Sequence, residues 1–155
     1  MPRQHAYQTT IRWTGDRGTG TSGYRDYDRA HEISAPGKAT TLSGSADPSF
    51  RGDPAAWNPE EMLLASLSAC HMLWYLGLCA AAGVTVTGYV DAADGEMVEE
   101  AGGGGRFTAV TLRPQITLAP GADRAKAEAL HHDAHEKCFI ANSVNFPVAV
   151  APTYV

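Results

Sequence analysis

The residues of this sequence that are best suited to chemistry are its three cysteines, Cys70, Cys79 and Cys138. A thiolate is a strong nucleophile, and two thiols that meet can be oxidised to a disulfide. Cysteine also serves as a small apolar side chain in cores, so packing is an alternative for each thiol taken alone. Cys79 follows Cys70 by nine positions, roughly 13 Å along a helix axis, so the two cannot pair within one straight helix. We therefore expect Cys79 to pack, and we consider Cys70 and Cys138 for chemistry.

Histidines offer a second kind of chemistry. Donors suited to a metal gather in two places: His131, His132, His135 and Cys138 late in the chain, and Cys70 with His71 in the middle. His131 and His135 have the spacing that places two ligands on one helix face. The sequence has no Cys-x-x-Cys or His-Glu-x-x-His run, and histidines on a solvated helix face are the commoner arrangement. We expect no metal, and a metal-dependent hydrolase stays the third alternative.

A long helix over residues 59–82 positions Cys70. Asn58 is suited to cap it, Pro59 suits the first helical position, and Gly83 is a plausible end. Residues 62–78 are apolar on almost every face, so the helix is expected to be buried in a core or between subunits. The apolar run borders on the length of a membrane span, but the rest of the chain is typical of a soluble domain, which favours a buried helix and no membrane.

The remaining patterns predict strands, turns and one more helix. We expect strands at 6–14, 24–33, 38–43, 84–90, 107–118 and 144–150, an irregular loop at 44–57, a glycine-rich turn at 101–105 and a second helix at 123–137. Pro114 indicates an edge, a bulge or a break in its strand. The order predicts a single α+β domain over residues 1–155, with antiparallel sheets wrapped around the long buried helix.

The composition limits which partners and which cellular compartment are expected for this domain. The net charge is −5 and no basic stripe is present, which argues against a nucleic-acid partner. The first residues are polar, so we expect no secretion signal. An odd number of cysteines without metal-binding spacing suits the reducing cytoplasm.

Two motifs, about seventy residues apart, resemble those of one family. The first is Asn58-Pro-Glu-Glu-x-Leu-Leu-x-Ser-Leu-Ser-Ala-Cys70, and the second is Ala134-His-Glu-x-Cys-Phe-Ile-x-Asn-Ser143. Together they resemble the OsmC/Ohr family, small thiol peroxidases named for osmotic induction and organic hydroperoxide resistance. The resemblance covers essentially the whole chain. Cys70-His71 and the loop around Arg51 are more similar to an OsmC-like branch than to Ohr enzymes.

The resemblance implies a cytoplasmic enzyme with two redox-active cysteines and no bound cofactor. Cys70 would attack an organic hydroperoxide and become a sulfenic acid, Cys138 would condense with it to a disulfide, and an external dithiol would reduce that disulfide. Position in the chain agrees with these roles. A reactive thiolate needs stabilisation that the middle of a helix does not supply, so a cation must come from elsewhere. Cys138 is near a helix C-terminus, where the dipole disfavours a thiolate, which suits a resolving thiol.

An arginine is the expected cation. The family places a functional arginine before the long helix, and Arg51 is our first choice, to hold Cys70 as thiolate and to orient the peroxide. Arg25 and Arg29 remain open. The alternative is that Arg51 merely braces its loop against a neighbouring aspartate.

Glu60 matches the acidic partner of this arginine in the family. It precedes Cys70 by ten positions, about 15 Å along a helix, so it cannot serve its own Cys70. We expect it to act across an interface between two antiparallel long helices, in the intertwined homodimer that the family forms. Favourable first-turn charge is the simpler alternative.

The sequence thus predicts a homodimeric thiol peroxidase that acts against oxidative stress. The candidate catalytic residues are Cys70, Cys138, Arg51 and Glu60, with organic hydroperoxide and a dithiol as partners. An apolar pocket around the thiols is expected to draw its lining from Met62, Leu63, Leu67, Trp74, Phe139 and Phe146. The alternative from another class is a non-catalytic dimer of the same fold that binds a hydrophobic ligand, with the cysteines as packing.

Overall fold

The computed structural model describes residues 1–155. The chain forms two compact units, Met1–Met62 and Leu63–Val155. The expectation that residues 1–155 act as one domain stays a prediction.

The first unit contains one antiparallel sheet with the strand order β1-β2-β3. Its elements are β1 (Thr10–Trp13), β2 (His31–Ser34), β3 (Leu42–Gly44) and the short 3-10 helix η1 (Pro48–Phe50). The register pairs Ile11 with Ile33, and Ile33 with Leu42. Because side chains alternate along a strand, these three residues share one apolar face, and Arg12 and Glu32 lie on the polar face.

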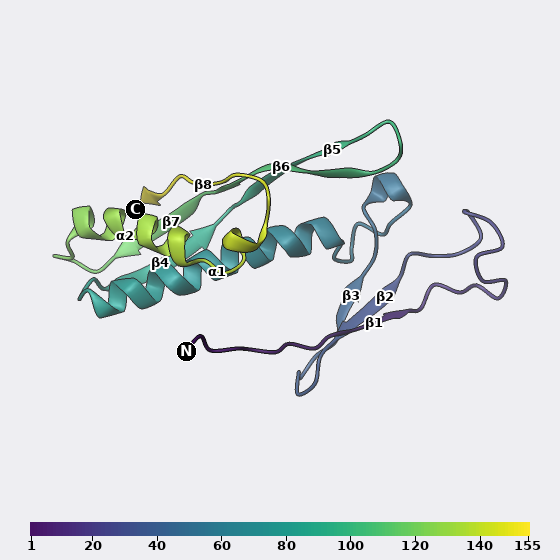
Figure 1. The fold of residues 1–155 in the computed structure, drawn as a ribbon, viewed down its shortest axis with the longest axis horizontal. Coiled ribbons are helices and arrows are strands. Elements are labelled where there is room, and N and C mark those ends of the chain that lie inside the picture. Colours follow the sequence, from purple (N-terminus) through teal and green to yellow (C-terminus); the bar gives the residue numbers. More distant parts are fainter. The chain divides into compact units, whose positions relative to one another are not determined.

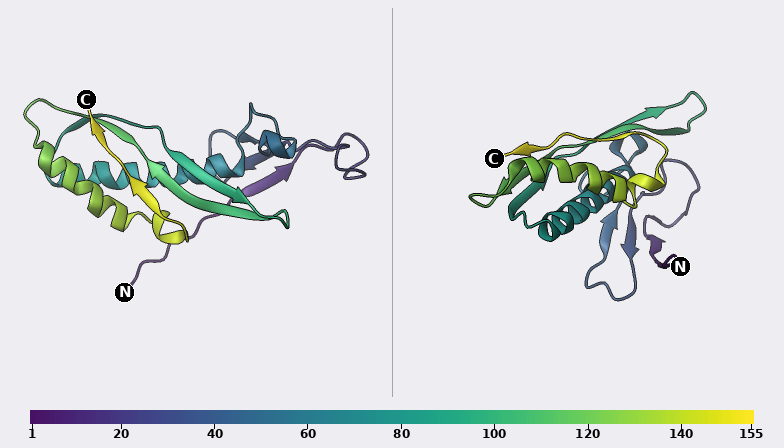
Figure 2. Two further views of the ribbon diagram at one scale, coloured as in Figure 1. Left: turned by 90° about the horizontal axis from the view of Figure 1, so that it is seen from above. Right: turned by 60° about the vertical axis from the view of Figure 1, so that its left-hand side comes forward.

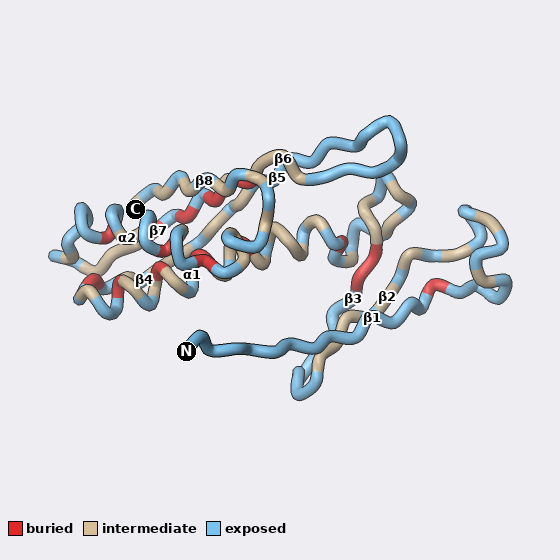
Figure 3. The backbone as a smooth tube through the Cα atoms, in the orientation of Figure 1, coloured by how far each residue is buried: buried red, intermediate tan, exposed pale blue.

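The apolar face has little cover within the first unit. Ile11 is 62% exposed and Leu42 is 44% exposed. All fully buried apolar residues of the chain belong to the second unit, and Figure 3 accordingly shows most of the first unit as exposed. The first unit therefore has no hydrophobic core of its own.

The second unit combines two helices with two three-stranded sheets (Figures 1 and 2). One sheet has the order β4-β7-β9 and the other has the order β5-β6-β8. The elements are α1 (Pro59–Ala81, whose first turn belongs to the first unit), β4 (Val86–Asp91), β5 (Asp94–Glu99), β6 (Gly105–Leu112), β7 (Pro114–Leu118), α2 (Arg124–Lys137), η2 (Ala141–Ser143), β8 (Val148–Val150) and β9 (Thr153–Tyr154). β8 and β9 join their sheets in parallel, and the other pairs are antiparallel.

The start of α1 is fixed by a reciprocal capping box. The side chain of Asn58 accepts a hydrogen bond from the backbone N–H of Glu61 at 2.8 Å, and the Glu61 carboxylate accepts one from the N–H of Asn58 at 3.2 Å. Two orphan donors of the first turn are satisfied in this way. Gly83, with φ of 73°, follows the last turn in the left-handed conformation that often terminates a helix.

Two clusters of buried side chains lie along α1. Leu67 packs in one cluster with Val110 and Leu112 of β6. Tyr75 and Cys79 pack in the other, which also holds Val84, Ile116, Ala127 and Ala134. Buried contacts therefore hold α1 at two places, at Leu67 and further along at Tyr75 and Cys79.

By length and composition alone, α1 is long and apolar enough to cross a membrane. A core helix of a soluble protein passes the same test. Only 22% of its most apolar window is buried within the chain, so much of its apolar surface is uncovered.

The α+β class with a long central helix is confirmed, and most of the strands are shorter than predicted. The two sheets of the second unit are mixed and not purely antiparallel, because β8 and β9 pair in parallel. The segment predicted as a strand at 24–33 is strand only from His31 onward. Residues before it form a loop that Arg29 holds together, as described below. Pro114 marks a break, because β6 ends at Leu112 and β7 begins at Pro114. β5 and β9 were not predicted; β5 is acidic and fully exposed, so it lacks the alternation of a half-buried strand.

Candidate functional site

Cys70 and Cys138 lie side by side in the second unit. Cys70 is half-buried on α1, and Cys138 is the first residue after α2, with only 1% of its surface exposed. The Cys70 thiol lies close enough to contribute to the raised pKa of the Cys138 thiol, and no disulfide joins them. The structure thus brings together two thiols that are 68 positions apart in the sequence.

The contact between the thiols depends on how α1 packs against α2. Two small residues of α2, Ala127 and Ala134, are fully buried in the cluster that also holds Tyr75 and Cys79 of α1. Beside Cys70, His71 Nε2 is hydrogen-bonded to His131 Nδ1 at 3.0 Å, and both rings are buried. Figure 2 shows α2 lying beside the C-terminal part of α1. The histidine pair therefore fixes α1 and α2 at the level of Cys70.

Cys138 is held by the backbone that follows it. The chain leaves the helical conformation at this residue, with ψ of 110°. The N–H of Ala141 donates to Cys138 Sγ at 3.4 Å, and the N–H of Ile140 lies near enough to the same sulfur to lower its pKa. Burial raises the pKa of Cys138 to about 11, and the two amides act in the opposite direction. Burial is thus the largest cause of the raised pKa, and the expected effect of the helix C-terminus stays a prediction.

An open apolar hollow adjoins Cys70. It has a volume of about 270 Å³ and is lined by Cys70, Leu73, Trp74 and Phe139. The rings of Trp74 and Phe139 meet edge to face, with centroids 5.5 Å apart. Leu73 and Phe139 are 65% and 67% exposed, so the hollow opens to solvent.

The sequence indicated only part of this lining. Trp74 and Phe139 were among the apolar candidates, but Leu67 and Phe146 pack in a core cluster instead. Leu73 was not anticipated. Its position three residues after Cys70, one helical turn along α1, is the signal that could have found it.

Arg51 lies in the first unit, directly after η1. It is the only non-glycine residue with a positive φ, 65°, which costs of the order of 1 kcal/mol for a residue with a side chain. Its side chain is exposed and forms no ion pair. Asp47 instead accepts from Ser49, and Asp53 accepts from the N–H of Ala55 at 2.9 Å. The loop is thus braced without the guanidinium of Arg51.

Glu60 also belongs to the first unit, in the first turn of α1. Its neighbour Glu61 supplies the carboxylate of the capping box, so Glu60 remains half-buried and outside that arrangement. Ten residues of continuous helix separate it from Cys70.

The two other arginines have different surroundings. Arg29 is sandwiched by aromatic rings: its guanidinium lies 4.3 Å from the Tyr24 centroid and 4.1 Å from the Tyr27 centroid. It also donates to the carbonyl oxygens of both tyrosines, at 2.8 and 2.7 Å. Arg25 is exposed. Arg29 is therefore fully engaged in its own loop, and Arg25 is not.

The buried histidine pair has two unsatisfied nitrogens, His71 Nδ1 and His131 Nε2. Burial lowers the pKa of each ring to about 4, with a further lowering of the His71 pKa by His135 and of the His131 pKa by His71. Asp91 acts in the opposite direction on the pKa of His71. The ring of His131 stacks on Tyr75 with centroids 3.9 Å apart. Both histidines are therefore neutral members of the core near neutral pH.

The third thiol and the remaining histidines lie outside this arrangement. Cys79 is buried and hydrogen-bonded to Tyr75, and burial raises its pKa. His132 is exposed and pairs with Glu136 at 3.3 Å. No group of three or more His, Cys, Asp or Glu side chains is placed to hold a metal ion.

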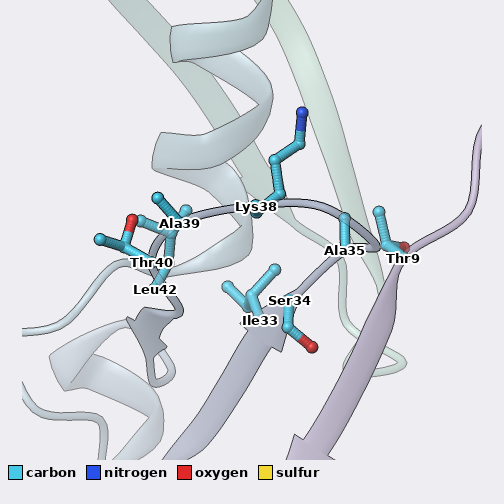
Figure 4. A pocket seen from close by; sticks show the side chains of 8 residues that line it. All are labelled: Thr9, Ile33, Ser34, Ala35, Lys38, Ala39, Thr40 and Leu42. Atoms are coloured by element: carbon cyan, nitrogen blue, oxygen red, sulfur yellow. The ribbon is translucent and has the colours of Figure 1, made fainter.

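The first unit has a hollow of its own, of about 280 Å³ (Figure 4). It is lined by Thr9, Ile33, Ser34, Ala35, Lys38, Ala39, Thr40 and Leu42. Ile33 projects toward the loop over the hollow, and the amino group of Lys38 points away from Ile33. The lining has no thiol, carboxylate or histidine, so it offers an apolar surface and no chemistry of its own.

Comparisons with known proteins agree on the family. The model of the family described as OsmC-like protein matches residues 52–152, a range that contains both cysteines of the site. The solved structure of an OsmC-like protein of unknown function from Vibrio cholerae is 31% identical, with a TM-score of 0.86, and the match covers 96% of this chain and 99% of that chain.

More distant structures share the fold. The organic hydroperoxide resistance protein OsmC from Legionella pneumophila is 17% identical, with a TM-score of 0.70, over 99% of this chain and 98% of that chain. The organic hydroperoxide resistance protein OhrB of Bacillus subtilis is 19% identical, with a TM-score of 0.63, over 97% and 98% of the two chains. A search of curated proteins finds no match. The family model and the relative from Vibrio cholerae together show that this chain belongs to the family of OsmC-like proteins.

Proposed function

We propose that this protein is a thiol peroxidase that reduces organic hydroperoxides to alcohols. The observation that carries this proposal is the pairing of a half-buried thiol with a buried one beside an open apolar hollow. A hydroperoxide can enter the hollow and reach Cys70, whereas Cys138 has almost no exposed surface. The names of the two distant structures, which refer to organic hydroperoxide resistance, support the same substrate class.

The proposed reaction follows from the position of Cys70 beside the hollow and of Cys138 behind it in the core. The Cys70 thiolate attacks the outer oxygen of the hydroperoxide, the O–O bond breaks, and the alcohol leaves with a proton, so that Cys70 becomes a sulfenic acid. The sulfur of Cys138 then attacks the Cys70 sulfur, the disulfide forms and water is released. An external dithiol returns both thiols to the reduced state, and no bound cofactor takes part.

The apolar lining favours hydroperoxides with an alkyl or aryl group. Burial of such a group against Leu73, Trp74 and Phe139 stabilises the complex by about 25 cal/mol for each Å² of apolar surface removed from water. Hydrogen peroxide has no such surface. We therefore expect a preference for bulky organic hydroperoxides.

Arg51 and Glu60 complete the proposed site. Arg51 supplies the cation that holds Cys70 as thiolate and orients the peroxide, and Glu60 orients the guanidinium. The left-handed backbone of Arg51 supports a functional role, because strain of this kind concentrates at functional positions. Its freedom from ion pairs with Asp47 and Asp53 supports it as well.

A homodimer is part of the proposal. Ala65, Ala69 and Gly77 are exposed along one side of α1, which leaves an apolar stripe on the helix. The apolar face of the first unit is exposed too. A second copy of the chain would cover both surfaces, with the long helices antiparallel and Glu60 acting across the interface. We place the protein in the cytoplasm, since its thiols must remain reducible.

Titration of free thiols tests the function. The reduced protein should lose two thiols per chain after one equivalent of an alkyl hydroperoxide, release the corresponding alcohol, and keep the third thiol free. The alternative function is a non-catalytic dimer that binds a hydrophobic ligand, and the apolar hollow of the first unit favours it. That alternative predicts no loss of thiols, and such a result would end the peroxidase proposal.

A further inference from the structure

The two sulfurs of the site are unequal in access. Cys70 lines the hollow that opens between the exposed side chains of Leu73 and Phe139, and Cys138 is 1% exposed. A partner subunit could cover more of this surface, but it could not expose Cys138. Because a thiolate must reach the disulfide sulfur that it attacks, access decides which sulfur of a disulfide reacts. Only the Cys70 sulfur can be reached from solvent.

The two sulfurs are also unequal in the hydrogen bonds that they receive. The backbone N–H of Ala141 donates to Cys138 Sγ at 3.4 Å, and the N–H of Ile140 also favours the anionic form of this sulfur. A sulfur that leaves as an anion gains more from such donors than a neutral one does. These amides are fixed by the turn into η2, so they are in place before the bond breaks.

We propose that the external dithiol attacks Sγ of Cys70, and that Cys138 is the leaving group, received by the backbone N–H groups of Ile140 and Ala141. This inference rests on the proposed peroxidase function and specifies its reductive half-reaction. The hollow beside Cys70 then serves both hydroperoxide and dithiol, one after the other.

The disulfide is reduced in two thiol–disulfide exchange reactions, which together transfer two electrons from the dithiol. A thiolate of the dithiol forms a bond to Cys70 Sγ, and the bond between the Cys70 and Cys138 sulfurs breaks with its electron pair on Cys138. Burial raises the pKa of Cys138 to about 11, so the released thiolate takes up a proton. The second thiol of the dithiol then attacks the dithiol sulfur that is bonded to Cys70. The dithiol becomes a disulfide, and Cys70 leaves as thiolate.

Mapping of the mixed disulfide tests this order. The disulfide form is made once with cumene hydroperoxide and once with diamide, exposed briefly to 2-mercaptoethanol, quenched in acid, alkylated and digested. We expect the mercaptoethanol adduct on Cys70 and the alkyl group on Cys138 and Cys79. An adduct mainly on Cys138, or equal amounts on both, overturns the proposal. If diamide forms the disulfide but cumene hydroperoxide does not, the proposed peroxidase function is wrong. The sample oxidised with diamide still shows which of the two sulfurs the thiol attacks.

A variant pair tests the two amides. Ala141→Pro removes one N–H donor, and Ala141→Ser keeps it. We expect Ala141→Pro to slow disulfide reduction by about tenfold, the size of effect that one hydrogen bond to a charged group produces, and Ala141→Ser to leave it unchanged. Equal rates in the two variants contradict the assignment of the amide. If Ala141→Pro does not fold, the mapping of the parent chain still decides which sulfur is attacked.

Discussion

The division of labour between Cys70 and Cys138 follows from what surrounds each sulfur. Cys70→Ser should abolish turnover, because no other thiol lines the hollow. Cys138→Ser should allow one oxidation of Cys70 and then stall or over-oxidise, because the sulfenic acid has no partner. Steady-state turnover and intact mass after one equivalent of hydroperoxide measure both outcomes.

Cys79→Ser is the matched control for these two variants. Cys79 packs in the core and bonds Tyr75, so its replacement should lower stability slightly and leave activity nearly intact. A loss of activity as large as that of Cys70→Ser would show that the thiols have been assigned wrongly.

Arg51 can be tested without loss of the fold because of its backbone. Arg51→Gly removes the guanidinium and suits a φ of 65°, so stability should change by less than about 1 kcal/mol. We expect kcat/KM to fall by about a hundredfold, the usual effect of removing one group that stabilises the transition state. Thermal unfolding and single-turnover kinetics separate the two effects.

Arg25→Ala provides the comparison for Arg51. Arg25 is exposed, and its side chain should be dispensable for activity. Arg29 is unsuitable as a control, since its guanidinium is enclosed by Tyr24 and Tyr27. Activity lost in Arg25→Ala and kept in Arg51→Gly would transfer the role to Arg25.

The contact between α1 and α2 makes stability depend on pH. Burial lowers the pKa of both His71 and His131 to about 4, so the unfolded chain, whose histidines titrate near pH 6.5, binds protons that the folded chain does not. Their contribution to stability is complete above about pH 6.5 and is lost as the pH falls toward 4. The slope is about 1.4 kcal/mol per pH unit for each proton taken up.

Urea unfolding at pH 7 and pH 5 measures this loss. The double variant with His71→Gln and His131→Gln should lose clearly less stability than the parent chain between the two pH values. An equal loss in both proteins would mean that the buried pair does not govern the acid sensitivity.

Elements with strong local signals could be predicted, and those set by contacts distant in sequence could not. The long helix was placed within one residue, because Asn58, Pro59 and Gly83 mark its ends directly. The segment at 24–33 looked like a strand, but the contacts of Arg29 hold most of it as a loop. β9 is only two residues long, and its pairing with β7 leaves no pattern in the sequence.

The proximity of Cys70 and Cys138 could be predicted from the sequence, but the surroundings of the two thiols could not. The motifs around Cys70 and Cys138 indicated the pair, whereas the amides at Cys138 and the hydrogen bond between His71 and His131 depend on the packing of α2 and the turn after it. The apolar lining was predicted only partly, because a helix that is apolar on nearly every face gives no sign of which side chains reach solvent.

The proposed assembly explains why so much apolar surface is exposed in a single chain. Ile11→Glu places a charge on the apolar face of the first unit and should weaken the dimer by tenfold or more, at roughly the cost of burying an unpaired charge. Arg12→Glu alters the polar face one residue away and should leave the dimer intact. Sedimentation equilibrium over a range of concentrations distinguishes the two; a monomeric parent chain would refute the assembly.

The central claim is that Cys70 and Cys138 of one chain form a disulfide when an organic hydroperoxide is reduced. Peptide mapping of the protein under non-reducing conditions, after one equivalent of cumene hydroperoxide, tests it most directly. The account predicts a linked pair of peptides that contain Cys70 and Cys138, with Cys79 free and cumyl alcohol released in equal amount. An unlinked Cys70, or a link from Cys70 to Cys79 or to another chain, would contradict it.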